Sequence, residues 1–364
     1  MAGNSFGEIL RLTTFGESHG TAMGGVLDGM PAGVWIDVTA VQSALDRRRP
    51  GQNDITSPRK EMDRVQFLSG FHPEADELGQ LQTLGTPIGF LIQNVDSHSA
   101  DYAALKEQFR PSHADYSYQA KYGVRDHRGG GRSSARETVC RVVGGALAQQ
   151  LLPQAIKIRA YVERMAGLGI PDGATYNMED ARNHPTGCPH AETAIAMENA
   201  LIQRKEEGDT AGGVIACHVE GVPAGLGEPV FDKLQARLAY ALMGINAAKG
   251  VEFGRGFAGA ESRGSLENDV ILSLGRTASN HSGGIQGGIS TGMPLFMRLA
   301  FKPIASIKTP QQSVDHQGNP VIIQVDGRHD PAVLPRAMPI VEAMVALVLA
   351  DFYLAQRHQT HSDV

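Results

Sequence analysis

The sequence predicts an α+β protein whose strands form antiparallel sheets. Short apolar runs follow one another across tight turns, as residues 24–28 and 34–38 do around Gly29-Met30-Pro31. Such strand–turn–strand pieces are typical of antiparallel pairing. Helices and strands do not alternate in the regular order of a parallel sheet. The chain has 364 residues, of which 41% are hydrophobic, so it has ample material for a core.

Strands are expected where short apolar or alternating runs lie between turn residues, and helices where apolar residues recur with a period near 3.6. The expected strands are residues 9–15, 24–28, 34–38, 87–95, 156–162, 213–220, 294–301 and 321–325. The expected helices are residues 39–49, 101–109, 134–151, 191–206, 232–248 and 336–352. Between these elements we expect a polar loop at 53–63, an acidic surface excursion at 74–82 and a frayed tail at 358–364.

The composition favours a single globular domain in a reducing cytoplasm. No repeat and no Ser- or Pro-rich linker divides the chain, so residues 1–364 are expected to form one domain. The three cysteines have no paired spacing and imply no disulfide framework. The N-terminus lacks the pattern of a secretory signal, and no apolar run is long enough to span a membrane. The net charge of −6 disfavours nucleic-acid binding, although Arg47 to Arg49 form a short basic run.

The segment from Gly123 to Gln150 is the most informative stretch of the chain. Gly129 to Gly131 allow positive φ angles and a close approach of a ligand to the backbone. Ser134 and the glutamate three residues later have the spacing of a capping box at a helix start. Backbone N–H groups, hydroxyls, Arg132 and Arg136 would together form an anion site at this helix start. The alternative is an ordinary capped helix with surface arginines.

Further candidates for a functional site lie in turns and at helix ends. Each alone has a plain alternative, since a lone loop histidine is usually a surface residue and an arginine at a helix C-terminus stabilises the helix dipole. Together they suggest a functional site, because guanidinium groups bind carboxylates and phosphates, and histidines donate protons near neutral pH. The combination predicts an enzyme site for a small phosphorylated and carboxylated metabolite. The residues are Arg48, Arg110, Arg132, Arg136, Arg328, His19, His113 and Asp330.

Two other segments are weaker candidates. His184, Cys188 and His190 could be drawn as a metal cluster, but their spacing matches no standard zinc pattern, so no metal is expected. The glycine-rich segment from Gly283 to Gly288 is neither a Walker loop nor a Rossmann fingerprint.

Three long motifs resemble the signatures of the chorismate synthase family. They are GESHGTAMGGVLDGMP at residues 16–31, GRSSARETVCRVVGGAL at 131–147 and RHDPAVLPRAMPIVEAM at 328–344. The segments DRRRPG, FRPSHADY, KYGVRD, PAGLGEPVFDKL, GGIQGGIS and FKP fit as well, so the resemblance spans nearly the whole chain. It implies a β-α-β sandwich, with helices packed between antiparallel sheets, and a homotetramer.

The resemblance also implies a reaction. Members of the family convert 5-enolpyruvylshikimate-3-phosphate to chorismate and phosphate, an anti-1,4-elimination in the shikimate pathway of aromatic amino-acid biosynthesis. The reaction requires reduced FMN without net redox change, and the enzyme is a cytoplasmic lyase. NADPH would enter only as an indirect electron source. Since the chain has no large extra segments, we expect an outside reductant to supply the reduced FMN.

The resemblance assigns roles position by position. His19 resembles the histidine that protonates the reduced flavin, and His113 the general acid that protonates the departing phosphate. Asp330 resembles the carboxylate that assists removal of the substrate proton through the flavin N5. Substrate-contacting positions are matched by Ser18, Arg48, Arg110, Ser134, Ala135, Arg136 and Arg328. Flavin-contacting positions are matched by Arg132, Ser133, Ser134, Asn246, Ala247, Gly287, Lys302, Pro303, Ile304, Ala305, Ser306 and Arg328, and Arg48 also matches a position linked to NADPH.

Four features depart from the family pattern. Asp54 stands where an arginine is usual, and we expect Arg59 or a rearranged loop to compensate. Ile304 replaces a usual threonine, Ser112 replaces a common glycine, and the region from Phe71 to Gly79 is longer than in many relatives. The alternatives are therefore a catalytically impaired FMN-binding protein of the same fold, and a different phosphate-handling enzyme or flavin reductase.

Overall fold

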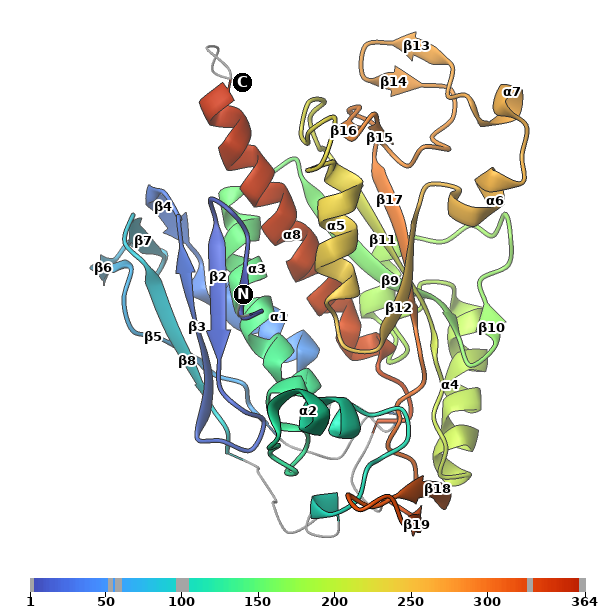
Figure 1. The fold of residues 1–364 in the computed structure, drawn as a ribbon. Coiled ribbons are helices and arrows are strands. Elements are labelled where there is room, and N and C mark those ends of the chain that lie inside the picture. Colours follow the sequence, from blue (N-terminus) through green and yellow to red (C-terminus); the bar gives the residue numbers. More distant parts are fainter. Residues whose placement is uncertain (1–2, 52–54, 56–60, 96–104, 326–329, 360–364) are drawn as a thin grey trace.

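The computed structural model describes residues 3–51, 55, 61–95, 105–325 and 330–359, and its main body is two antiparallel sheets with helices between them (Figure 1). The first sheet has the spatial order β1 (Ser5–Phe6), β2 (Arg11–Phe15), β3 (Ala22–Asp28), β8 (Ile88–Gln93) and β5 (Val65–Phe67). The second has the order β10 (Leu168–Gly169), β9 (Lys157–Met165), β11 (Gly213–Glu220), β17 (Leu295–Phe301) and β12 (Ala248–Phe253). Between them lie α1 (Val38–Arg48), α3 (Thr138–Leu151), α5 (Leu234–Met243) and α8 (Leu334–Gln359). The predicted α+β class and β-α-β sandwich are confirmed.

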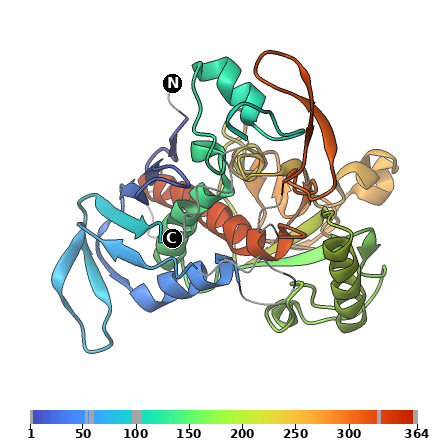
Figure 2. The same ribbon diagram turned by 90° about the horizontal axis from the view of Figure 1, so that it is seen from below.

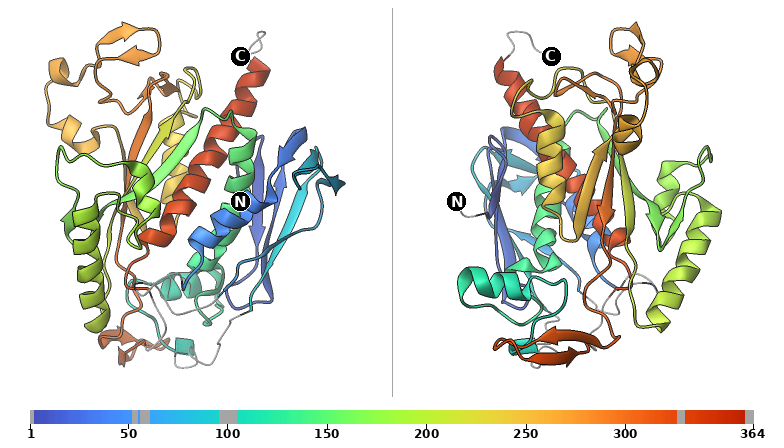
Figure 3. Two further views of the ribbon diagram at one scale, coloured as in Figure 1. Left: turned by 180° about the vertical axis from the view of Figure 1, so that it is seen from behind. Right: turned by 45° about the vertical axis from the view of Figure 1, so that its right-hand side comes forward.

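Smaller elements surround this body. Helix α4 (Ala191–Glu206) lies on the outer side of the second sheet (Figure 3). Helix α2 (Asp115–Tyr122) and the hairpin of β18 (Gln311–Val314) and β19 (Pro320–Ile323) lie at the end of the sandwich that Figure 2 views from below. The opposite end carries α6 (Gly256–Ala260), α7 (Gly264–Glu267), β13 (Ile271–Ser273), β14 (Arg276–Thr277), β15 (Ile285–Gln286) and β16 (Ile289–Ser290).

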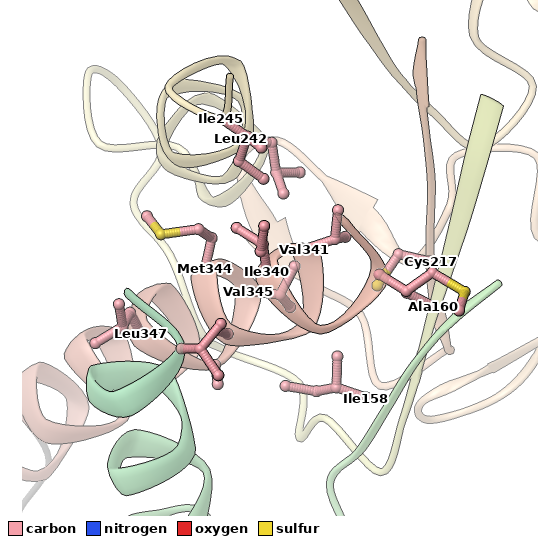
Figure 4. Close-up of a cluster of buried hydrophobic side chains, with 14 of the residues drawn as sticks. Ile158, Ala160, Cys217, Leu242, Ile245, Ile340, Val341, Met344, Val345 and Leu347 are labelled. Atoms are coloured by element: carbon pink, nitrogen blue, oxygen red, sulfur yellow. The ribbon is translucent and has the colours of Figure 1, made fainter. Parts of the chain in front are cut away.

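Helix α8 is the central helix of the core. Val341 and Val345 are fully buried, with side chains of α5 on one side and of the second sheet on the other (Figure 4). Its segment Leu334–Arg357 is apolar and long enough to cross a membrane, but 78% of its apolar window is buried inside the protein, as in a core helix. Because one hydrophobic cluster joins both sheets and the helices between them, we propose that the chain is a single folding domain.

Helices α3 and α8 approach each other closely at a glycine. A Cβ added to Gly145 would lie 2.3 Å from both Cα and Cβ of Ala343, so one helix backbone would have to move. The preceding Gly144 differs, because a Cβ there would meet only the flexible end of Leu12, with 2.9 Å to Cδ2. The close approach therefore accounts for a glycine at 145, which a helix interior disfavours by about 1 kcal/mol relative to alanine.

We expect Gly145→Ala to lower the free energy of unfolding by about 1–3 kcal/mol, the usual cost of overpacking a core. Gly144→Ala is the matched control, since a gain of about 1 kcal/mol in helix propensity offsets a contact that Leu12 can relieve by rotation. Urea unfolding of the two variants measures the difference. Equal stabilities would contradict the importance of the α3–α8 contact.

The start of helix α3 differs from the sequence prediction. Two 3₁₀ turns, Gly131–Ser133 and Ala135–Glu137, come first, and the α-helix begins only at Thr138. Ser134 does cap this start, because its Oγ accepts from the backbone N–H two residues later at 3.3 Å, but a capping box would use the N–H three residues later. The Glu137 carboxylate does not reach back to complete the box. It accepts instead from Arg141 Nε at 2.9 Å, since that side chain lies one helical turn further on.

Two further differences lie near the N-terminal sheet. Helix α1 begins one residue before the predicted Thr39, because Asp37 caps it by accepting from the N–H groups of its first turn. The predicted excursion at 74–82 is wrong in part, since its ends belong to strands. The strands β4 (Ala32–Ile36), β7 (Leu81–Leu84) and β6 (Phe71–Ala75) form a separate three-stranded sheet in that order.

Some predictions concern segments outside the described residues. Residues 101–104 of the predicted helix 101–109 lie there, as do Asp54, Arg59 and Arg328. At the C-terminus α8 extends through Gln359, past the end predicted at residue 352, and 360–364 lie outside the described residues.

Candidate active site

A cleft of about 380 Å³ is lined in part by the residues that precede α2, the helix that Figure 2 shows at one end of the sandwich. Segments far apart in the sequence meet there. They are the loop after β2, the C-terminal end of α1, the segment before α2, the glycine loop before α3, the turn between α5 and β12, and the segments after β17 and before α8. The cleft therefore depends on the whole sandwich.

The cleft brings together most of the residues that the resemblance implied. His19, His113 and Asp330 all line it. The lining residues proposed for substrate are Ser18, Arg48, Arg110, Ser134, Ala135 and Arg136. Those proposed for flavin also include Ser133, Asn246, Ala247, Lys302, Pro303, Ile304, Ala305 and Ser306.

Two predicted flavin positions, Arg132 and Gly287, do not line the cleft. The guanidinium of Arg132 points to β2, where Nη2 donates to the carbonyl oxygen of Thr14 at 2.9 Å and to its hydroxyl. It thereby ties the glycine loop to the first sheet. Gly287 has a positive φ of 62° and lies between β15 and β16.

The glycine loop lies between the two histidines. Gly129, Gly130 and Gly131 all have positive φ angles, of 63°, 92° and 54°, as predicted from the sequence. A Cβ on Gly129 would lie 2.4 Å from Cε1 of His19, and one on Gly130 would lie 3.0 Å from Cε1 of His113. The bare backbone of this loop therefore sets where both imidazole rings lie.

We expect Gly129→Ala to impair turnover much more than it impairs folding, because the added methyl group would push His19 out of place. The matched control is Gly123→Ala. Gly123 also has a positive φ, of 73°, but a Cβ there would meet nothing within 4 Å. Both variants carry a backbone strain of about 1–2 kcal/mol, and steady-state kinetics with thermal unfolding separates the effects. Equal loss of turnover in both would contradict the packing role of Gly129.

His113 is held from behind by a buried carboxylate. Its Nδ1 lies 2.9 Å from Oδ1 of Asp115, whose side chain is 3% exposed. Arg110 donates to the same carboxylate from Nε at 2.8 Å and from Nη2 at 2.9 Å. Because Nδ1 is hydrogen-bonded to Asp115, the ring nitrogen that faces the cleft is Nε2. This arrangement suits a general acid, whose proton must point toward the reacting group.

A second buried carboxylate joins two of the predicted substrate arginines. Asp63 accepts from Nη1 of Arg48 at 2.9 Å and from Nη1 of Arg136, and its side chain has no exposed surface. Burial raises the pKa of Asp63, but the charges of these two arginines outweigh it and lower the pKa below its ordinary value. Glu61 lines the cleft and lies 2.6 Å from the same Nη1 of Arg136.

Arg48 contacts the protein through all three of its nitrogens. Besides Asp63, its Nε donates to Thr138 Oγ1 at 3.2 Å and its Nη2 donates to the carbonyl oxygen of Ala135 at 3.0 Å. Burial lowers the pKa of Arg48 to about 10, although Asp63 opposes the shift, so the group is still charged at neutral pH. Arg48 would therefore stabilise an anion in the cleft mainly through the electrostatic field of its fixed charge.

Asp330 and Arg336 form a further ion pair at the start of α8. Arg336 donates to Oδ2 of Asp330 from Nη1 and to the carbonyl oxygen of Arg48 from Nε at 3.0 Å. Both side chains line the cleft, and Asp330 is 7% exposed. The pair links the carboxylate predicted to take a proton to the arginines predicted to bind substrate.

One of the lining residues predicted to bind flavin has a buried acceptor that is unpaired in the described part of the chain. Asn246 donates from Nδ2 to the carbonyl oxygen of Ser133 at 3.0 Å, while its Oδ1 is buried with no hydrogen-bond partner among the described residues. Such an orphaned acceptor can take an N–H of a flavin ring. Nearby, Nζ of Lys302 donates to the carbonyl oxygen of Ser112 at 2.7 Å, and burial together with Lys249 lowers the pKa of Lys302.

Four charged residues of this site were not predicted from the sequence. Asp115 and Arg336 lie inside motifs already noted, FRPSHADY and RHDPAVLPRAM. Their charged side chains in these motifs could have marked them as candidate site residues. Glu61 and Asp63 lie at the end of a polar segment where charged residues are common, so no signal marked them. Ser112 has a φ of 56°, a left-handed conformation that glycine adopts most readily, as the glycine expected there from the family resemblance would.

The other histidine cluster has structural contacts. His190 caps α4 by accepting from the N–H of Thr193 at 3.4 Å, and Sγ of Cys188 lies 3.7 Å from the carbonyl oxygen of His190. His184 lies 2.9 Å from the hydroxyl of Thr186 through Nδ1. Within the described ranges no group of three or more His, Cys, Asp or Glu side chains is placed to hold a metal ion.

Comparison with known proteins identifies one family. The family model described as chorismate synthase matches residues 10–354. The chorismate synthases of Christiangramia forsetii and Bacteroides fragilis are both 51% identical to this chain, over 98% and 97% of it and over 99% and 98% of their own lengths. A crystal structure of chorismate synthase matches with a TM-score of 0.74 at 30% identity, covering 96% of this chain and 93% of the other. The chain belongs to the chorismate synthase family.

Proposed function

We propose that the chain is a lyase that eliminates phosphate from 5-enolpyruvylshikimate-3-phosphate to form chorismate. The observation that carries this proposal is a cleft in which two histidines and a carboxylate lie among arginines. The substrate carries two carboxylates and a phosphate, which guanidinium groups bind well. The cations that line the cleft are Arg48, Arg110, Arg136, Lys302 and Arg336.

Each protein group has a task that its contacts support. His113 holds a proton at Nε2 and gives it to the departing phosphate, which makes phosphate a better leaving group. Arg110 lies beside it and binds the phosphate. Asp330 assists removal of the substrate proton on the other side of the elimination. His19, whose Nδ1 lies 3.0 Å from the hydroxyl of Ser18, would hold a proton for the reduced flavin.

Reduced FMN would supply a transient electron to the elimination, as the family resemblance implies. The residues that would hold it are Ser133, Ser134, Asn246, Ala247 and 302–306. The unpaired Oδ1 of Asn246 supports the assignment of these residues to flavin binding. Arg132 would act through the loop that it ties to β2. Gly287 and Arg328 are proposed from the family resemblance alone.

We also propose a cytoplasmic homotetramer that takes its reduced FMN from an outside reductant, with NADPH only as an indirect electron source. The family resemblance supports these assignments. Anaerobic NADPH should therefore leave the visible absorption of protein-bound FMN unchanged, whereas rapid bleaching would contradict an outside reductant. Sedimentation of the purified protein should give the mass of four chains.

The experiment that tests the reaction is anaerobic turnover. The purified protein receives 5-enolpyruvylshikimate-3-phosphate with either oxidised or dithionite-reduced FMN, and phosphate and chorismate are followed together. We expect equal amounts of both products, and only with reduced flavin. If a folded protein that binds FMN releases neither product, the catalytically impaired FMN-binding alternative is correct.

A further inference from the structure

Asp115 is a buried carboxylate beneath the cleft, and none of the roles above uses it. It begins helix α2 and does not itself line the cleft. Its side chain is 3% exposed, and three cationic or ionisable groups surround it, those of Arg110, His113 and Arg125. A carboxylate loses much hydration free energy on burial, and it stays ionised only where charges and hydrogen bonds compensate.

The contacts of Asp115 divide between its two oxygens. Oδ2 accepts from the backbone N–H of Arg110 at 3.1 Å and from Nε of the same residue at 2.8 Å. Oδ1 accepts from Nη2 of Arg110 at 2.9 Å, and it lies 2.9 Å from Nδ1 of His113 and 3.2 Å from Nη1 of Arg125. One rigid group therefore fixes both a histidine and an arginine whose other ends face the cleft.

This geometry determines which atoms are left for a ligand. Because Asp115 accepts at Nδ1, the imidazole of His113 keeps a proton there and offers Nε2 to the cleft. Because Arg110 uses Nε and one N–H of Nη2 for the same carboxylate, both N–H groups of Nη1 and the second N–H of Nη2 remain for an anion. Burial raises the pKa of Asp115, but hydrogen bonds from Arg110 and His113 outweigh it and lower the pKa, so the carboxylate is charged at neutral pH.

We propose that Asp115 is a positioning residue that aligns the general acid and the phosphate-binding arginine with the same phosphate group. It acts on the chemical step through His113 and on substrate binding through Arg110. The inference rests on the function proposed above. It predicts two separable effects of a change at position 115, one on kcat and one on KM.

The test is a double-mutant cycle of Asp115→Asn and His113→Ala, measured as anaerobic turnover with reduced FMN. Asp115→Asn alone should lower kcat at least about tenfold, because the neutral amide no longer stabilises the positive charge of an imidazole that carries protons on both Nδ1 and Nε2. It should also raise KM. In the His113→Ala background, adding Asp115→Asn should leave kcat within about twofold of the value for His113→Ala alone, while it still raises KM. The effects of residues that act as a unit are not additive.

A second variant and a control separate positioning from folding. Asp115→Glu keeps the charge and should retain more of kcat than Asp115→Asn, although the longer side chain disturbs packing more. Asp351 is the matched buried carboxylate, since it accepts from three backbone N–H groups of residues 8–10 and lies about 25 Å along α8 from Leu334. Asp351→Asn should lower the unfolding midpoint and leave kcat and KM unchanged.

The possible results are distinct. An equal loss of kcat from Asp115→Asn in both backgrounds would overturn the inference, because Asp115 would then act independently of His113. Better kcat in Asp115→Asn than in Asp115→Glu would also overturn it, since packing rather than charge would matter. Normal turnover in His113→Ala alone would instead refute the role of His113 in the proposed function.

Discussion

Replacing His113 with alanine should slow turnover by roughly 10²- to 10⁴-fold, the range for loss of one positioned general acid. The imidazole lines the cleft, and Asp115 fixes its orientation through Nδ1 at 2.9 Å. KM should change little, because Arg110 keeps its two side-chain hydrogen bonds to Asp115 without the ring. Anaerobic steady-state kinetics with reduced FMN measures both constants.

The control is a histidine that does not line this cleft. His72 is exposed on strand β6, so His72→Ala should leave kcat and KM as in the parent protein. Near-normal turnover of His113→Ala would mean that another group protonates the phosphate or that the phosphate leaves as an anion bound only by arginines. Either result would remove the central acid from the proposed mechanism.

An asparagine in place of Asp63 should destabilise the protein by about 3–5 kcal/mol, the usual result of breaking a buried ion pair. It should also raise the KM for substrate, because Arg48 and Arg136 lose their common counter-ion. Asparagine is nearly the same size and tolerates the positive φ of 45° at this position. The variant therefore tests the charge of Asp63 with little change of backbone or volume.

The stability effect should depend on pH in a defined direction. Burial raises the pKa of Asp63, but the charges of Arg48 and Arg136 lower it by more, so the net shift is downward. Such a carboxyl stabilises the fold above its unfolded pKa of about 4, and the stabilisation is lost as the pH falls through the lower folded value. Unfolding free energies of Asp63→Asn and the parent should therefore converge as the pH falls below about 4. A difference that stays constant through the acid range would contradict this account.

Regular elements far from the site could be predicted from the sequence with correct bounds. The predicted helix 191–206 and strand 213–220 coincide with α4 and β11. Both have clear periodic patterns, and Gly208 marks the end of the helix. The positive φ angles of Gly129 to Gly131 were also predictable, since only glycine adopts them freely.

The parts that escaped prediction depend on contacts between distant segments. The α-helix starts at Thr138 only after two 3₁₀ turns, and these turns follow a loop that is packed between His19 and His113. The role of Asp63 could not be seen either, since Arg136 lies 73 positions later in the chain. A periodic pattern describes one element at a time and contains no information on such pairings.

A crystal structure of the ternary complex tests the central claim most directly. Oxidised FMN should not support turnover, so crystals grown with it and 5-enolpyruvylshikimate-3-phosphate should trap the intact substrate. We predict that the substrate phosphate lies within hydrogen-bond distance of Nε2 of His113, and that the flavin ring lies against Oδ1 of Asn246. Ligands bound in another part of the molecule, such as the groove beside Trp35 and Arg159, would contradict it.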